Sequence, residues 1–187
     1  MTVFGDGGAH MQHYGDQDRG IIQVSWDDVM EICKHLALEI SREFDPDIVI
    51  GIAKGGVIPA AIIASILRKD FYPIRISRRK KDVVVRDRPE VSVPITGEVE
   101  GKRVLIVDEV SQTGETLRLA VREAQKLGAK KVKTATLYAR RSEWKPNWFG
   151  FESDAVIIQP WDYEVLSGGK FIIHPEYEQA IAEAERE

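Results

Sequence analysis

Apolar and polar positions change period several times along the chain, and each change predicts a strand or a helix. The predicted strands are short apolar or alternating runs at 47–52, 72–77, 103–107, 133–138 and 155–158. Helical spacing of apolar residues predicts helices beginning at Ser25, Val57 and Gly114, with a weaker one from Pro175. Strands and helices therefore alternate, and residues 48–52 and 104–107 of two of these strands are apolar throughout. This pattern predicts an α/β fold, a doubly wound parallel sheet with flanking helices.

Composition narrows the classes of protein that fit this pattern. The chain has 187 residues, of which 43% are hydrophobic and 30% charged, so one globular domain is expected. Its net charge of −4 disfavours a dedicated nucleic-acid binder, which would be basic. The single cysteine, Cys33, excludes an internal disulfide and a cysteine-rich zinc site. No apolar run reaches the ~18 residues of a membrane span, and no signal peptide is evident, so we expect a cytoplasmic protein.

Two segments differ in character from the rest. Residues 1–20 are rich in Gly, Asp and Gln without an apolar period, which predicts a flexible segment before a single domain at 21–187. Residues 78–100 begin with the basic run Arg78–Lys81 and contain a polar, proline-bearing break. This segment is interpreted either as a solvated hairpin or as a mobile loop.

The chemistry-bearing residues cluster after the strand at 103–107. Asp108 and Glu109 are adjacent carboxylates at its end, and the small polar turn 111–116 then opens a helix. Backbone N–H groups and the helix dipole make such a turn suitable for a phosphate group. Neighbouring carboxylates are suited to sugar hydroxyls, or to magnesium held through water. Together these features indicate a site for ribose 5-phosphate.

The run from Val104 to Thr116 resembles the phosphoribosyl-pyrophosphate (PRPP) motif of type I phosphoribosyltransferases. The resemblance implies that the 5-phosphate of PRPP is bound by Ser111, Gln112, Thr113, Gly114, Glu115 and Thr116. It also implies that Asp108 and Glu109 hold the ribose, are catalytic, and contact Mg²⁺ through water. A small hood formed by 140–187 is expected to bind the base.

Two further segments resemble parts of the same family. Lys54-Gly55-Gly56 resembles its pyrophosphate loop, which implies a cis peptide bond between Ala53 and Lys54. Gln159-Pro160-Trp161-Asp162 resembles the base-binding segment of bacterial xanthine-guanine phosphoribosyltransferases, which implies base contacts from Trp161 and Asp162. Arg140 follows a strand where the purine enzymes have a lysine that contacts the base. The alternatives are a core aromatic at Trp161 and a solvated charge at Arg140.

One residue departs from the family pattern. Gln112 stands where many 6-oxopurine enzymes have an aspartate assigned to proton transfer, and an amide cannot act as a base. The resemblance implies transfer of ribose 5-phosphate from PRPP to a purine base, a 6-oxopurine being favoured, in a homo-oligomer (dimer or tetramer) that uses Mg²⁺. The alternatives are transfer to another base and a non-catalytic regulator that senses PRPP or nucleotides.

Overall fold

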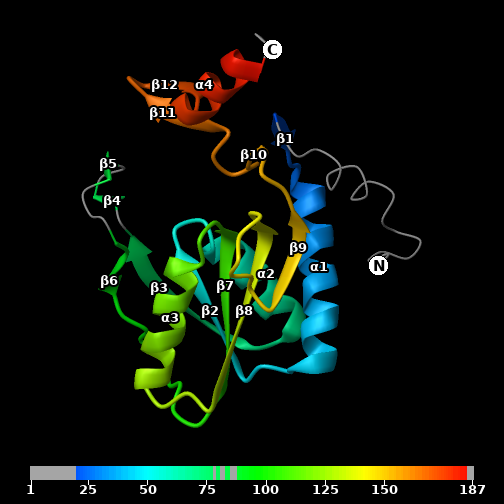
Figure 1. The fold of residues 1–187 in the computed structure, drawn as a ribbon, viewed down its shortest axis with the longest axis vertical. Coiled ribbons are helices and arrows are strands. Elements are labelled where there is room, and N and C mark those ends of the chain that lie inside the picture. The colour runs from blue at the N-terminus through cyan, green and yellow to red at the C-terminus, as the bar shows by residue number, and fades with distance from the viewer. Residues whose placement is uncertain (1–19, 78, 81–82, 85–87, 185–187) are drawn as a thin grey trace. The chain divides into compact units, whose positions relative to one another are not determined.

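The protein is described by a computed structural model that covers residues 20–77, 79–80, 83–84 and 88–184 (Figure 1). Its chain divides into two compact units. The larger unit is Glu31–Glu152, and the smaller one combines the described residues up to Met30 with those from Ser153 onward. The predicted single domain at 21–187 with a hood at 140–187 stays a prediction.

The larger unit is built on a six-stranded sheet in the order β6-β3-β2-β7-β8-β9. The strands are β2 (Ile48–Ala53), β3 (Asp70–Ser77), β6 (Glu90–Val93), β7 (Arg103–Ser111), β8 (Lys131–Ala139) and β9 (Trp148–Glu152). Five of them run parallel, and β6 pairs antiparallel with β3 at one edge. The predicted parallel sheet is therefore confirmed, while β9 was not predicted.

Helices cover both faces of this sheet. α2 (Val57–Leu67) packs on one face, where Gly51 allows close approach: a β-carbon there would lie 2.8 Å from the Cβ of Ala60. α3 (Glu115–Lys126) packs on the other face and buries Leu117, Ala120 and Ala124 among isoleucines of β2 and β7. Figure 1 shows the two helices on opposite sides of the sheet. The doubly wound arrangement is confirmed.

α1 (Trp26–Glu43) begins at a predicted capping box. The Ser25 backbone N–H donates to the Asp28 carboxylate at 2.9 Å, and the Asp28 N–H donates to Ser25 Oγ at 3.2 Å. Two backbone donors at the helix start are thereby satisfied. Further along α1, Ile32 lies against Gly150 of β9.

The smaller unit holds short elements of its own. β1 (Ile21–Gln23) pairs in parallel with β10 (Val156–Ile158), so the predicted strand at 155–158 is present but lies outside the six-stranded sheet. β11 (Glu164–Ser167) and β12 (Lys170–Ile173) form a hairpin that was not predicted. α4 (Pro175–Ala184) follows, as the sequence predicted. Within the described ranges, no helix has the length and apolar character needed to cross a membrane.

The basic segment after β3 is described in part. β4 (Arg79–Lys80) pairs antiparallel with β5 (Val83–Val84), which agrees with the hairpin interpretation. Arg78 and Lys81 lie outside the described residues, as do residues 1–19, for which flexibility was predicted.

Candidate functional site

The candidate site begins where β7 continues past its neighbour. β2 pairs with β7 only as far as Gly51 opposite Val107, whereas β8 stays paired with β7 up to Ser111. Asp108 and Glu109 therefore emerge at the carboxyl end of the sheet, beside the point where the chain leaves β2 for α2. In open α/β sheets this edge is where ligands bind.

The turn Lys54-Gly55-Gly56 packs directly against the two carboxylates. A β-carbon on Gly55 would overlap the Glu109 carboxylate, and one on Gly56 would lie 2.7 Å from the Asp108 Cα. Gly56 has no room for a larger residue because the backbone of Asp108 is in the way, whereas a larger residue at position 55 would require the Glu109 carboxylate to move. The predicted cis peptide bond between Ala53 and Lys54 is confirmed. Two segments more than fifty residues apart in the sequence thus form one surface.

The Asp108 side chain lies in a poorly solvated position. Burial raises its pKa well above the ordinary value, and the negative charge of Glu109 raises it further. The Glu109 backbone N–H donates to Asp108 Oδ1 at 2.9 Å, which acts in the opposite direction. The pair consequently favours a positively charged neighbour, which would stabilise both carboxylates in the ionised form.

The turn after β7 has the shape expected for a phosphate site. Gly114 has a φ of 74°, a left-handed conformation that suits glycine, and it begins α3 without a side-chain cap. The first amides of a helix lack partners within the helix, so they are available to an anion. Gln112 and Thr113 are exposed, and Thr116 is half-buried, as is Glu115. The Ser111 hydroxyl differs, because it is buried without a hydrogen-bond partner among the described residues.

Two residues that the sequence did not single out support this turn. The Trp144 indole lies so close to Gly114 that a β-carbon on the glycine would overlap it. Arg118 donates from Nη2 to the Thr113 carbonyl oxygen at 3.3 Å. Trp144 is thirty residues from Gly114 in an irregular loop, so no periodicity indicated the contact. The position of Arg118 in the first turns of α3, close to the polar turn, was a weak signal in the sequence for its contact with that turn.

Arg140 lies at the same edge of the sheet. It directly follows β8, and its backbone N–H donates to the Ser111 carbonyl oxygen at 2.8 Å. Its own carbonyl oxygen accepts from Lys145 Nζ at 3.0 Å, and the same ammonium pairs with Glu152. The larger unit therefore brings together the residues predicted for the ribose, pyrophosphate and 5-phosphate, together with Arg140.

Trp161 and Asp162 belong to the smaller unit. The Trp161 ring is half-buried and tilted against Trp26, with 6.0 Å between ring centroids. The Tyr177 hydroxyl donates to Asp162 Oδ1 at 2.8 Å and accepts from the Gln159 backbone N–H at 3.4 Å. Tyr177 of α4, which the sequence did not assign a role, thus fixes the segment that carries both predicted base contacts.

The carboxylates of Asp108 and Glu109 fit a magnesium ion. Mg²⁺ prefers oxygen ligands, and in phosphate-handling sites it is commonly held by one or two carboxylates, substrate phosphates and water. Within the ranges the structure describes, no group of three or more His, Cys, Asp or Glu residues gathers as a metal cage. Asp108 and Glu109 are therefore the two carboxylates that could hold such an ion at this site.

Comparison with known proteins identifies the family to which these features belong. Residues 25–167, which include every element of the six-stranded sheet, match the phosphoribosyl transferase domain. The chain belongs to the phosphoribosyl transferase domain family. The family resemblance seen in the PRPP motif is therefore confirmed over residues 25–167.

Individual members of the phosphoribosyl transferase family differ in what their names assign to them. The chain is 35% identical to a hypoxanthine-guanine phosphoribosyltransferase of Schizosaccharomyces pombe over 127 residues, 58% of this chain and 62% of that one. It superposes with a TM-score of 0.69 on a purine phosphoribosyltransferase of Pyrococcus horikoshii, at 34% identity, covering 81% of this chain and 99% of that one. Over 101 residues it is 31% identical to the transcriptional regulator GfcR of Thermoplasma acidophilum, covering 54% and 48% of the two chains.

The alignments with the hypoxanthine-guanine phosphoribosyltransferases cover only part of those proteins. The chain spans 62% to 65% of the two hypoxanthine-guanine phosphoribosyltransferases it matches. Orotate phosphoribosyltransferases match as well, at 29% to 33% identity. The comparisons therefore show the family and the fold of this phosphoribosyl transferase domain. Its relatives differ in substrate, so its own residues have to indicate which base it uses.

Proposed function

We propose that this protein is a glycosyltransferase that moves ribose 5-phosphate from PRPP to a purine base, with a 6-oxopurine favoured, and releases pyrophosphate. One observation carries the proposal. The glycine turn 54–56 and the carboxylates of Asp108 and Glu109 form one surface at the end of the sheet, beside the amides that open α3. A pyrophosphate, a ribose and a 5-phosphate are connected in that order in PRPP.

The reaction exchanges one bond at ribose C1′ for another. The bond from C1′ to the pyrophosphate oxygen breaks, and its electron pair leaves with pyrophosphate. A ring nitrogen of the base forms the new bond to C1′ with its lone pair, and the base gives up its N7 proton to water. Positive charge develops on the ribose during this exchange, and the carboxylates of Asp108 and Glu109 are suited to stabilise it.

The remaining residues of the larger unit act mainly by binding and positioning. The Lys54 ammonium and the Gly55 and Gly56 amides hold the pyrophosphate that leaves. The amides of residues 112–116, with the hydroxyls of Thr113 and Thr116, hold the 5-phosphate. Fixing both ends of PRPP orients C1′ toward the base, which replaces an encounter in solution with a prearranged geometry.

The base is assigned to Trp161, Asp162 and Arg140. A half-buried indole offers a flat face on which a purine can stack, and the hydrogen bond from Tyr177 orients Asp162 beside it. Arg140 is suited to donate to the purine O6, as the lysine of the resembling enzymes does. Gln112 orients the N7 edge of the base and, because it is an amide, leaves the proton to solvent.

Magnesium is assigned to Asp108 and Glu109 through water. When bound, it supplies charge neutralisation on the pyrophosphate. The raised pKa of Asp108 supports this assignment, since two neighbouring carboxylates in a poorly solvated position favour a cation nearby.

The decisive experiment is a panel of bases with PRPP and Mg²⁺, read out as pyrophosphate release and nucleotide formation. Hypoxanthine, guanine or xanthine should be converted, and adenine and orotate should not. Asp108→Asn with Glu109→Gln is expected to remove turnover, while Glu176→Gln on α4 serves as the control for loss of an exposed carboxylate. Conversion of orotate alone would overturn the base assignment, and PRPP binding without any conversion would overturn the activity.

A regulator that binds PRPP or nucleotides without turnover is the second candidate. Two observations favour it: the amide at Gln112 in place of a proton acceptor, and the similarity of part of the chain to the regulator GfcR. The net charge of −4 speaks against contact with nucleic acid. Retention on heparin together with PRPP binding and no pyrophosphate release would favour the regulator over the enzyme.

A further inference from the structure

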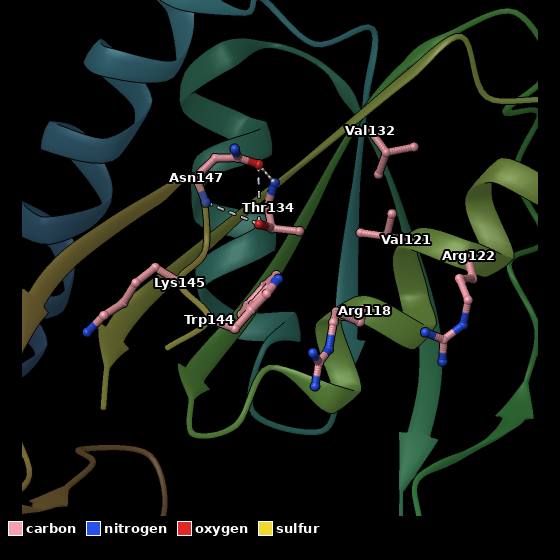
Figure 2. Close-up of a pocket in the computed structure, with 8 residues that line it drawn as sticks. All are labelled: Arg118, Val121, Arg122, Val132, Thr134, Trp144, Lys145 and Asn147. Atoms are coloured by element: carbon pink, nitrogen blue, oxygen red, sulfur yellow. Dashed lines mark hydrogen bonds between the residues drawn. The ribbon is translucent and has the colours of Figure 1, made fainter. Parts of the chain in front are cut away.

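A hollow of about 370 Å³ lies between the solvent side of α3 and the loop that precedes β9 (Figure 2). Arg118, Val121 and Arg122 line it from α3, and Trp144 faces them from the loop. This volume lies within the range of small-molecule sites, which runs from roughly 300 to 1,000 Å³. None of the predicted ribose, pyrophosphate or base residues lines it.

At the base of the hollow, Thr134 and Asn147 are hydrogen-bonded to each other. The Thr134 backbone N–H donates to Asn147 Oδ1 at 2.9 Å, and the Asn147 N–H donates to Thr134 Oγ1 at 3.2 Å, as the dashed lines of Figure 2 show. These two residues satisfy each other. A ligand therefore meets the apolar surfaces of Val121 and Val132 and the half-buried indole of Trp144.

The rim of the hollow is cationic. Arg118 and Arg122 stand four residues apart on α3, so their side chains project from the same face of the helix. Both are exposed, and among residues 20–77, 79–80, 83–84 and 88–184 no carboxylate forms an ion pair with either. The nearby acidic side chain of Glu123 is paired with Lys126. Lys145 is already engaged by Glu152, so the charges left for a ligand are the Arg122 guanidinium and the donors of Arg118 that are not bonded to the Thr113 carbonyl oxygen.

A hollow lined by an indole and two guanidinium groups favours a particular kind of ligand. An indole face favours another aromatic ring, and each guanidinium presents a planar fork of donors that matches a carboxylate or phosphate. A purely apolar molecule would leave both arginines unused, and an inorganic anion would leave the indole uncovered. We propose that this hollow is a second ligand site, which binds a small planar aromatic molecule carrying two anionic groups.

The hollow adjoins the phosphate turn without being part of it. Trp144 lies against Gly114, and Arg118 donates to the Thr113 carbonyl oxygen, so both residues belong to the hollow and to the support of the turn. Arg122 lies one helical turn further from Thr113 and serves the hollow alone. Arg122 is therefore the residue whose replacement tests the hollow separately from the proposed PRPP site.

Binding is tested on the full chain with benzene-1,3-dicarboxylate as the probe, by calorimetric titration. Arg122→Gln should weaken binding at least about tenfold, and Arg122→Lys should weaken it less because the charge remains without the fork. Arg42→Gln, which removes an exposed arginine from the last turn of α1, should bind as the wild type does. Lys54→Gln should also leave binding unchanged, because that side chain belongs to the proposed pyrophosphate site.

The location of the probe is tested by fluorine NMR of protein labelled with 5-fluorotryptophan. The chain has four tryptophans, and single Trp→Phe variants assign their signals. The Trp144 signal should shift on saturation with the probe. Equal affinities of wild type and Arg122→Gln, or a shift confined to Trp161, would overturn the proposal. So would the absence of saturable binding by the wild type. Loss of binding in Lys54→Gln would assign the probe to the PRPP site instead.

Discussion

The carboxylate of Glu109 lies against Gly55 so closely that the glycine has no room for a β-carbon. This contact joins the end of β7 to the turn after β2, and it places a residue assigned to ribose against a residue assigned to pyrophosphate. A side chain at residue 55 must push Glu109 away or open the turn. The contact therefore makes the spacing of the two halves of the site sensitive to a single methyl group.

Replacing Gly55 with alanine should raise the KM for PRPP at least tenfold, equivalent to about 1.4 kcal/mol. The physical reason is the overlap with Glu109, which displaces one of the proposed ribose contacts. Gly101→Ala is the matched control, because Gly101 has a φ of 70° with no atom near its Cβ position. That variant should lose stability and keep its KM. An unchanged KM for Gly55→Ala, measured by initial rates, would show that the contact is irrelevant to PRPP.

The ion pair between Asp47 and Arg103 predicts a dependence of stability on pH. Hydrogen bonds from Arg103 to Asp47, at 2.7 to 3.2 Å, lower the pKa of Asp47 from 3.8 to about 2. A depressed pKa stabilises the folded state at pH values above 3.8, and this contribution is lost as the pH falls toward 2. Asp47→Asn should therefore lower the free energy of unfolding at pH 7 by about 1 kcal/mol, because solvent screens this partly exposed pair.

The difference between the wild type and Asp47→Asn should close between pH 4 and pH 2, as followed by urea unfolding at each pH. Asp70→Asn removes another exposed carboxylate, at the start of β3, and serves as the control. A difference that persists at pH 2 would mean that the asparagine acts by a route other than the lost charge.

The contact between Trp161 and Trp26 allows stacking on the base to be separated from local packing. Trp161→Ala should raise the KM for the base. The rise should correspond to a loss of about 1–3 kcal/mol of binding free energy, the range known for aromatic stacking on bases. PRPP binding should stay nearly unchanged. Trp26→Ala removes the tilted partner, which is 53% exposed, and should change the base KM less. Equal effects of the two variants in steady-state kinetics would identify Trp161 as a packing residue.

Tyr177→Phe tests whether the orientation of Asp162 matters. The substitution leaves the ring in place and removes the 2.8 Å hydrogen bond to Asp162, together with the longer one, 3.4 Å, from the Gln159 N–H. The loss of one such hydrogen bond is worth about 1 kcal/mol. The KM for the base should therefore rise roughly fivefold with PRPP binding unaffected. Tyr163→Phe, one residue after Asp162, is the control. A wild-type base KM in Tyr177→Phe would show that Asp162 does not depend on this contact.

The sequence correctly predicted the secondary structure around those candidate residues that lie close together in the chain, while their roles stay predictions. Asp108, Glu109 and Gly114 lie within one strand, turn and helix, so their arrangement follows from the order of residues alone. The Trp144 contact with Gly114 and the Tyr177 contact with Asp162 each join segments that are separated in the sequence, and the pattern of apolar residues does not indicate which segments meet. β9 and the β11–β12 hairpin were missed for a related reason, since both are short runs without a distinctive period. The homo-oligomer expected from the sequence stays a prediction.

Gln112 offers the sharpest test of the proposed chemistry, because it is exposed beside the phosphate turn and cannot accept a proton. If the substrate is a 6-oxopurine, Gln112→Asp should raise kcat on hypoxanthine, guanine or xanthine with little change in PRPP affinity. General-base assistance typically raises a reaction rate 10²–10⁴-fold. Without it, the departure of pyrophosphate and the positioning of the reactants have to provide the rate acceleration in this protein. Gln112→Asn is the matched control, since it has the length of aspartate without its charge. Two results together would identify proton transfer from the base as the step that this chain leaves to water. Gln112→Asp, but not Gln112→Asn, should raise kcat, and the rate of Gln112→Asp should fall as the new carboxylate is protonated. A neutral or harmful effect of Asp on all three bases would point instead to another proton acceptor, another base or a regulator.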